Sequence, residues 1–272
     1  MNEFSTSLKH GFLTDKNGLK TSFYISKKDN KPLAVLIHGF GGNAYGMSFL
    51  GRELARDFRI LLLEMPNHGK SDFLSIKKAE DLRNWNREIM EKIEQRFGAI
   101  SLIVCHSMGC FSPSKDFSER IPTALINPVF QTPSKAILGV KINSISAIGA
   151  LTNLPIFSPI KALFLIKIWR AQSVKNVFEN MIFSFASPLK FARQAKMAQI
   201  PLSEPFFSGE YSAVSMIFHG SRDKLTLPLS KQNKAKYFPQ TKIISLDTGH
   251  LAPIEIPEII AREIRDNLKT HQ

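Results

Sequence analysis

Short apolar runs alternate along the chain with longer segments whose apolar residues recur at helical spacing. Residues 33–37 and 60–63 are uninterrupted apolar runs, typical of strands covered on both faces, and between them Leu50, Leu54 and Phe58 share one face of a helix. The whole pattern predicts strands at 21–25, 33–37, 60–63, 100–104, 124–126, 214–218 and 242–246, and helices at 47–58, 79–97, 229–238 and 254–268. Strands that alternate with helices predict a mostly parallel sheet with helices on both faces.

The segment 131–204 interrupts this alternation. It has no strand pattern, and its long apolar stretch, 156–169, contains Pro159 and two lysines, so it is too short and too polar to cross a membrane. We expect several short amphipathic helices, either packed as a core pair or placed as a lid over a site. We favour a lid, because predicted strands flank the segment on both sides. This predicts an α/β core at 1–130 and 205–272, with 131–204 as a helical cap.

The most informative stretch is a serine at the end of the predicted strand 100–104. Ser107 is followed two positions later by Gly109, which is typical of a sharp turn from a strand into a helix. In such a turn the hydroxyl stands clear of the backbone, and N–H groups at the helix start face whatever it attacks. Pro113 would remove a hydrogen bond from a longer helix, so we expect the helix after Ser107 to be very short or kinked.

A serine hydroxyl is a weak nucleophile that needs a base, and the base needs an orienting acid. Asp223 and His250 each follow a predicted strand, and neighbouring parallel strands would bring them to one edge of the sheet. The chain order Ser107, Asp223, His250 is that of α/β hydrolytic enzymes rather than of the serine proteases. The backbone N–H groups of Phe40 and Met108 are the expected donors to the oxyanion.

Other acidic and nucleophilic residues are candidates for the same roles. Asp247 lies close to His250 in sequence and could serve as the acid instead of Asp223, and Glu64 is a further alternative acid. Cys105 and Cys110 flank the serine, but neither occupies the apex of the turn, so we do not expect a cysteine nucleophile.

The glycine-rich loop after residues 33–37 and the apolar cap supply candidate substrate contacts. These are His38, Gly39 and Trp169. Glycine allows the backbone to approach a ligand closely. Histidines at such positions more often brace loops than catalyse, which applies to His38 and His68, and we expect His106 to pack beside the serine turn.

Length and composition limit the number of domains and the kinds of cross-link or metal site that the chain can have. The 272 residues are enough for one large α/β domain, and two cysteines cannot make a disulfide framework. No Cys/His spacing suits zinc, so we expect no metal and no cofactor. The first residues lack the basic and apolar regions of a secretory signal, and with the low cysteine count this predicts a cytoplasmic protein.

Positive charge is concentrated in one part of the chain. The net charge is +13, and residues 134–200 hold nine lysines and arginines against one acid, Glu179. This is either a lysine-rich composition or a basic surface for an anionic partner. The charges are interleaved with apolar residues and form no recognition motif, so we expect no nucleic-acid partner. There is no transmembrane segment in the pattern, although transient contact with a membrane surface stays open.

Five motifs in order resemble the α/β-hydrolase fold superfamily, of the lid-bearing serine esterase and lipase type. They are His-Gly-Phe-Gly-Gly at 38–42 (oxyanion loop), Met-Pro-Asn-His-Gly-Lys-Ser at 65–71 (the Pro-Gly-His-Gly-x-Ser turn), Cys-His-Ser-Met-Gly at 105–109 (the Gly-x-Ser-x-Gly elbow), and the acid and histidine loops at 220–223 and 249–250. The resemblance covers about residues 20–270 and implies an α/β-hydrolase fold with a helical lid. Asn67, Cys105 and Pro113 depart from the family pattern.

The resemblance implies a serine hydrolase that cleaves a carboxylic ester through an acyl-enzyme on Ser107. The basic, apolar cap suggests an acyl chain on an anionic or carrier group: a fatty acyl ester, a lysophospholipid, or an acyl group on an acidic carrier protein. The last would be similar to the carboxylesterases that demethylate pimeloyl-carrier esters. A thioesterase, acyltransferase or C–C hydrolase would use the same triad, and a silent binding protein could keep the fold, so the fold does not decide among them.

Overall fold

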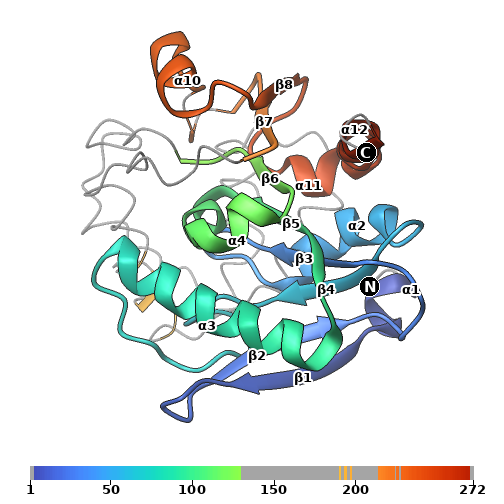
Figure 1. The fold of residues 1–272 in the computed structure, drawn as a ribbon, viewed down its shortest axis with the longest axis vertical. Helices are drawn as coiled ribbons and strands as arrows, with labels where there is room; N and C mark the ends of the chain where they lie inside the picture. Colours follow the sequence, from blue (N-terminus) through green and yellow to red (C-terminus); the bar gives the residue numbers. More distant parts are fainter. Residues whose placement is uncertain are drawn as a thin grey trace, which may run out of the picture.

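The computed structural model describes residues 3–129, 190, 193–194, 197, 214–223, 225–226 and 228–269, and an eight-stranded sheet organises them (Figure 1). The strands are β1 Lys9–Thr14, β2 Lys20–Ile25, β3 Leu33–Ile37, β4 Arg59–Leu63, β5 Ile100–His106, β6 Thr123–Ile126, β7 Met216–Gly220 and β8 Lys242–Leu246. Their order in the sheet is β1-β2-β4-β3-β5-β6-β7-β8. The pairs β1–β2 and β2–β4 are antiparallel, and the others are parallel.

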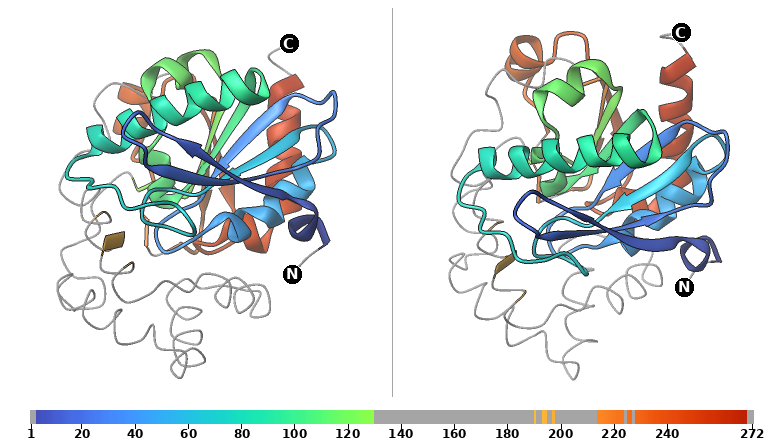
Figure 2. Two further views of the ribbon diagram at one scale, coloured as in Figure 1. Left: turned by 90° about the horizontal axis from the view of Figure 1, so that it is seen from below. Right: turned by 60° about the horizontal axis from the view of Figure 1, so that its bottom comes forward.

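Helices cover both faces of this sheet (Figures 1 and 2). They are α1 Glu3–Ser7, α2 Ala44–Leu54, α3 Ala79–Phe97, the 3-10 helix η1 Ser107–Phe111, α4 Lys115–Arg120, α10 Lys231–Tyr237, α11 Ala252–Glu255 and α12 Pro257–Lys269. Helices α3 and α4 lie on one face, and α2, α11 and α12 lie together on the other. The predicted architecture, a mostly parallel sheet between two helical layers, is therefore confirmed.

Strand β3 shows why the apolar runs are uninterrupted. Val35 and Ile37 pack into the core beneath α3, whereas Ala34 and Leu36 pack into the core beneath α2 and α12. Successive side chains of a strand point to opposite faces, and both faces here are covered by helices. All of these side chains are fully buried, so every position of the strand must be apolar.

The structure differs from the sequence-based prediction at several elements. Helix α2, at Ala44–Leu54, begins and ends earlier than the predicted helix 47–58, and α1 and α4 were not predicted. Strand β1 was not predicted, because this edge strand is only partly buried and contains polar residues and a glycine. The predicted C-terminal helix is divided at Ile256, where Pro257 begins α12 as a separate helix. The short helix expected after Ser107 is confirmed, since η1 ends before Pro113.

The predicted cap, 131–204, falls outside the described residues except at four positions. Of these, Gln194 donates from Nε2 to the carbonyl of Asn67 at 2.9 Å, and Met197 is buried against the core beneath α3. The lid itself therefore stays a prediction.

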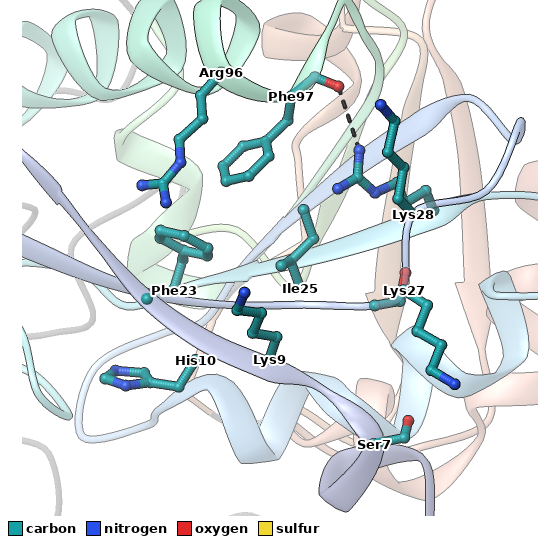
Figure 3. A pocket seen from close by; sticks show the side chains of 12 residues that line it. Ser7, Lys9, His10, Phe23, Ile25, Lys27, Lys28, Arg96 and Phe97 are labelled. Atoms are coloured by element: carbon teal, nitrogen blue, oxygen red, sulfur yellow. Dashed lines mark hydrogen bonds between the residues drawn. The ribbon is translucent and has the colours of Figure 1, made fainter.

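In the described ranges, no helix combines the length and the apolar character needed to cross a membrane. A cavity of about 360 Å³ opens between β1, β2 and the C-terminal end of α3, beside Arg59 at the start of β4 (Figure 3).

Candidate active site

The sheet register brings the glycine-rich loop beside the serine turn. Ile37 pairs with Cys105 in the parallel β3–β5 ladder, so the residues two positions further on, Gly39 and Ser107, leave the sheet side by side. A Cβ atom at position 39 would lie 2.7 Å from the Cβ of Ser107, which leaves room for glycine alone. In the sheet β3 lies between β4 and β5, so the strand order reverses at β3. Reversals of this kind place binding sites at the carboxyl ends of the strands.

Ser107 stands at a strained turn between β5 and η1. Its φ of 53° is in the left-handed region that L-residues other than glycine rarely adopt. Gly109 is required two residues later, because a Cβ there would lie 2.4 Å from the carbonyl oxygen of His38. Strain of this kind persists where the surrounding structure enforces it, as at a nucleophile on a strand-to-helix elbow.

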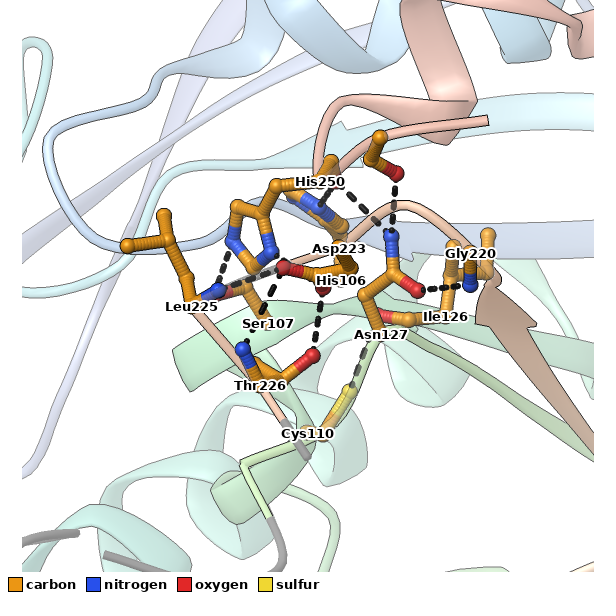
Figure 4. A network of polar contacts seen from close by, with 11 residues as sticks. His106, Ser107, Cys110, Ile126, Asn127, Gly220, Asp223, Leu225, Thr226 and His250 are labelled. Atoms are coloured by element: carbon orange, nitrogen blue, oxygen red, sulfur yellow. Dashed lines mark hydrogen bonds and ion pairs between the residues drawn. The ribbon is translucent and has the colours of Figure 1, made fainter. Parts of the chain in front are cut away.

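The structure brings Ser107, His250 and Asp223 together in one chain of hydrogen bonds (Figure 4). The Nε2 of His250 lies 2.9 Å from the Oγ of Ser107, and its Nδ1 lies 2.8 Å from the Oδ2 of Asp223. With the Nδ1 proton donated to the carboxylate, Nε2 is left as an acceptor for the serine hydroxyl. The imidazole is therefore held in the tautomer that can take the serine proton.

Asp223 is held as a carboxylate by four donors. Besides His250, the backbone N–H groups of Leu225 and Thr226 donate to Oδ1, at 2.8 and 3.2 Å, and the hydroxyl of Thr226 donates to Oδ2. Burial by itself raises the pKa of Asp223, but the charge of protonated His250 and these hydrogen bonds together lower it to about 2. The group beside the imidazole is thus negatively charged at neutral pH.

The alternative acids lie elsewhere. Asp247 has an exposed side chain that pairs with Arg222 at 3.2 Å. Glu64 is buried, and its carboxylate accepts from the backbone N–H of Lys70 at 2.7 Å, which closes the turn after β4. Asp223 is accordingly the carboxylate that contacts His250.

Asn127, which the sequence pattern did not indicate, joins the loops that carry Asp223 and His250. Its Nδ2 donates to the carbonyls of Gly249 and His250, at 3.1 and 2.9 Å, and its Oδ1 accepts from the N–H of Gly220 at 2.7 Å. Asn127 is fully buried and has a φ of 46°, which asparagine tolerates better than most residues. In the sequence, the position of Asn127 directly after a predicted strand could have indicated that it belongs to the site.

His106 packs beside the serine turn, as expected, and contributes a second brace. Its Nε2 donates to the carbonyl of His250 at 2.8 Å. Burial, followed by the charge of protonated His250, lowers the pKa of His106 to about 3. The ring is therefore neutral and serves as a hydrogen-bond donor to the backbone.

His38 and His68 tie the loop after β3 to the loop after β4. His38 donates from Nδ1 to the carbonyl of Gly39 at 2.8 Å and accepts from the N–H of Met65 at 3.1 Å. His68 donates to the carbonyl of Pro66 at 2.8 Å and accepts from the N–H of Gly41 at 3.2 Å. Burial lowers the pKa of both rings, which keeps them neutral and able to accept.

The contacts of His38 agree with the expectation that it braces a loop, since both of its ring nitrogens hydrogen-bond to the backbone and its side chain is buried. Contact of His38 with substrate stays a prediction. Gly39 does lie against Ser107. Trp169 lies outside the described residues.

The departures from the family motifs are accommodated by the local structure. Asn67 has a φ of 68°, in the left-handed region that glycine favours and that asparagine tolerates better than most residues. Asparagine can therefore stand where the resemblance expects glycine. Cys105 is fully buried in the core beneath α3, and the thiol of Cys110 lies 3.3 Å from its carbonyl oxygen. Burial raises the pKa of both thiols well above the ordinary value, so neither is poised as a nucleophile.

The two expected oxyanion donors belong to the loops that meet at Ser107. Met108 is the residue after the serine, in the first turn of η1, where backbone N–H groups have no helical acceptor. Phe40 follows Gly39, and its side chain is exposed. Among the described residues there is no group of three or more His, Cys, Asp or Glu that could hold a metal ion.

Comparison with known proteins agrees with this geometry. A sequence profile described as the alpha/beta hydrolase family matches residues 34–263. No curated protein sequence matches the chain. Solved structures with the same fold include the enol-lactonase from Burkholderia xenovorans LB400, with 15% identity over 95% of this chain and 100% of that one and a TM-score of 0.71. A thermophilic esterase from Thermogutta terrifontis is 17% identical over 96% and 98% of the two chains, with a TM-score of 0.73.

A third such structure is a thioesterase domain from the curacin biosynthetic pathway, 15% identical over 95% of this chain and 99% of that one, with a TM-score of 0.64. At these identities the likeness shows the fold. The family profile covers most of the chain, including all three residues of the hydrogen-bonded chain. The protein belongs to the alpha/beta hydrolase family.

Proposed function

We propose that this protein is a serine hydrolase that cleaves a carboxylic ester through an acyl-enzyme on Ser107. The observation that carries the proposal is the continuous path Ser107 Oγ–His250 Nε2 and His250 Nδ1–Asp223 Oδ2, at 2.9 and 2.8 Å. This path supports the proposal, because nucleophilic catalysis by serine requires a base beside the hydroxyl and an acid that orients the base.

In the first half of the reaction, Ser107 Oγ attacks the ester carbonyl while His250 takes its proton. The imidazolium that forms is stabilised by the carboxylate of Asp223, whose lowered pKa keeps it ionised. His250 then returns the proton to the leaving alkoxide. In the second half the same imidazole activates water, which releases the acid from Ser107.

The negative charge on the tetrahedral intermediate needs donors near Ser107. The N–H groups of Met108 and Phe40 are the proposed pair, because both belong to the segments that meet at the serine. Each such donor typically contributes about 10²–10³ in rate. The proposal is supported by the close approach of Gly39 to Ser107, which fixes the loop that carries Phe40.

Cleavage of an oxygen ester is favoured over the other reactions of the same triad. Two of the structural neighbours are named as an esterase and an enol-lactonase, and a lactone is a cyclic ester. Another neighbour is named as a thioesterase domain, so thioester cleavage is the alternative to test in parallel.

The test is hydrolysis of p-nitrophenyl esters from acetate to palmitate, with acyl-coenzyme A thioesters of matched chain length. Turnover of the esters that is lost in Ser107→Ala and kept in Ser112→Ala is the expected result. Ser112 is a matched control, because it is a buried serine of the same turn whose hydroxyl donates to the carbonyl of Gly109. Turnover of thioesters alone would replace the ester proposal, and turnover of neither would contradict both.

The leaving group is proposed to be anionic or to be an acidic carrier. Support comes from the charge of residues 134–200, which lie almost wholly outside the described part of the chain. Neutralising Lys161, Lys167 and Arg170 together should slow hydrolysis of an anionic ester and leave a neutral ester unaffected. An unchanged rate on the anionic ester in this variant would remove the reason for an anionic substrate. The cytoplasmic location likewise stays a prediction.

A further inference from the structure

The cavity beside β1 and β2 lies at the opposite end of the sheet from Ser107. It holds about 360 Å³ and is lined by residues of β1 and β2, by Arg59 at the start of β4, and by the last residues of α3. Five of its lining residues carry positive charge: Lys9, Lys27, Lys28, Arg59 and Arg96. None of the lining residues is acidic.

Within the ranges that the structure describes, none of these five cations forms an ion pair with a carboxylate. Several like charges around one small cavity repel one another and create a strongly positive potential inside it. An anion in the cavity would relieve that repulsion.

Arg59 is the most constrained member of the group. It is only 9% exposed, and its Nε is buried without a hydrogen-bond partner in the described part of the chain. Its Nη1 reaches the carbonyl of Phe97 at 3.4 Å, which is long for a hydrogen bond. A buried charge is normally paired, and leaving it unpaired is costly. The guanidinium of Arg59 has one long hydrogen bond, to Phe97, and no carboxylate partner among the described residues.

The cavity also has an apolar wall. Figure 3 shows Phe23, Ile25 and Phe97 in the middle of the view, with Arg96 to one side and Lys27 and Lys28 to the other. The guanidinium of Arg59 lies 5.5 Å from the ring centroid of Phe97, and that of Arg96 lies 5.1 Å from it. Contacts with the rings hold both guanidinium groups beside the cavity.

We propose that this cavity binds a small organic phosphate, a phosphate monoester carrying an apolar or aromatic group. Guanidinium groups bind phosphate oxygens with two parallel hydrogen bonds, and the lysines at the rim add charge. The apolar wall accounts for the organic part, which inorganic phosphate lacks. The site is separate from the ester site, because Arg59 begins β4 whereas Gly39 and Ser107 follow the ends of β3 and β5.

The test is calorimetric titration of the whole protein with phenyl phosphate, inorganic phosphate and phenol. Phenyl phosphate should bind most tightly, and its Kd should rise with ionic strength. Arg59→Gln should raise that Kd by about tenfold or more, because a charge-assisted pair is lost. Lys16→Gln, which removes the same charge from an exposed residue outside the cavity, should leave the Kd unchanged. Neither variant should change ester hydrolysis.

A second variant guards against a folding defect in Arg59→Gln. Lys27 and Lys28 are exposed, so the double variant Lys27→Gln/Lys28→Gln should fold normally and still weaken phenyl phosphate binding. Absence of binding by the wild type, or equal binding by the wild type and both cavity variants, would overturn the proposal. Binding to vesicles of phosphatidic acid in phosphatidylcholine, without binding of phenyl phosphate, would also overturn it and assign the basic surface to a lipid headgroup.

Discussion

The side-chain amide of Asn127 donates to the backbone carbonyl of His250 at 2.9 Å, and His106 donates to the same oxygen at 2.8 Å. Two buried groups thus fix the backbone of the residue whose ring contacts Ser107. Because Asn127 also accepts from Gly220, the same side chain sets the distance between the loops of His250 and Asp223.

Replacing Asn127 by alanine should therefore lower kcat more than it changes KM. Three buried backbone groups lose a partner, and a small displacement of the base from its productive position costs about 10²-fold. The measurement is steady-state hydrolysis of a p-nitrophenyl ester. Asn86→Ala is the control, because Asn86 is buried in α3 with no side-chain hydrogen bond among the described residues. Equal loss of kcat in both variants would indicate general destabilisation rather than positioning.

The lowered pKa of Asp223 predicts how stability depends on pH. A carboxyl whose pKa falls from 3.8 to about 2 on folding contributes about 2 kcal/mol above pH 5. The contribution is lost as the pH falls from 4 toward 2, because the folded state binds the proton less readily than the unfolded state.

Urea unfolding of the wild type and of Asp223→Asn, from pH 7 down to pH 2.5, measures this contribution. The difference in free energy of unfolding should be largest near neutral pH and should shrink in acid. A difference that stays constant over this range would show that the carboxylate is not stabilised by folding.

The buried thiols predict resistance to alkylation. Cys105 and Cys110 are fully buried, and burial raises the pKa of both, so little thiolate is present in the folded protein. Iodoacetamide at pH 8 should modify neither residue, and esterase activity should persist; both should react after denaturation. Rapid alkylation with loss of activity would instead point to a cysteine near the reacting atoms.

Gly39→Ala should abolish most activity while the protein stays folded. A Cβ at this position would lie 2.7 Å from the Cβ of Ser107 and 3.2 Å from the carbonyl of His106, so the loop must move. We expect kcat to fall by about 10²-fold or more, since the proposed oxyanion donor, the N–H of Phe40, moves with the loop. Gly51→Ala, in the middle of α2, is the matched control and should keep full activity. A normal kcat in Gly39→Ala would contradict a role of this loop in catalysis.

Much of the fold could be predicted where side-chain burial alone decides the structure. The bounds of β3 and α3 agree with the pattern of apolar residues, and the chain order Ser107, Asp223, His250 indicated which strand ends would meet. These features depend on local periodicity and on the general geometry of parallel sheets.

The features that the sequence did not reveal depend on partners distant in the chain. Asn127 bonds to residues 93 and 122 positions away, and nothing in the neighbouring sequence specifies those partners. Likewise, His38 accepts from the N–H of Met65, which lies 27 residues away in the next loop, and the sequence did not indicate this partner. Strand β1 lacked an apolar pattern because one of its edges has no neighbouring strand among the described residues.

The most direct test of the account is reaction of the protein with a fluorophosphonate, followed by mass spectrometry of its peptides. A phosphonyl adduct on Ser107 is expected in the wild type and in Ser112→Ala, and no adduct is expected in Ser107→Ala or in wild-type protein unfolded beforehand. An unlabelled wild-type protein, or an adduct on another residue while Ser107 stays unmodified, would contradict the assignment of Ser107 as the nucleophile.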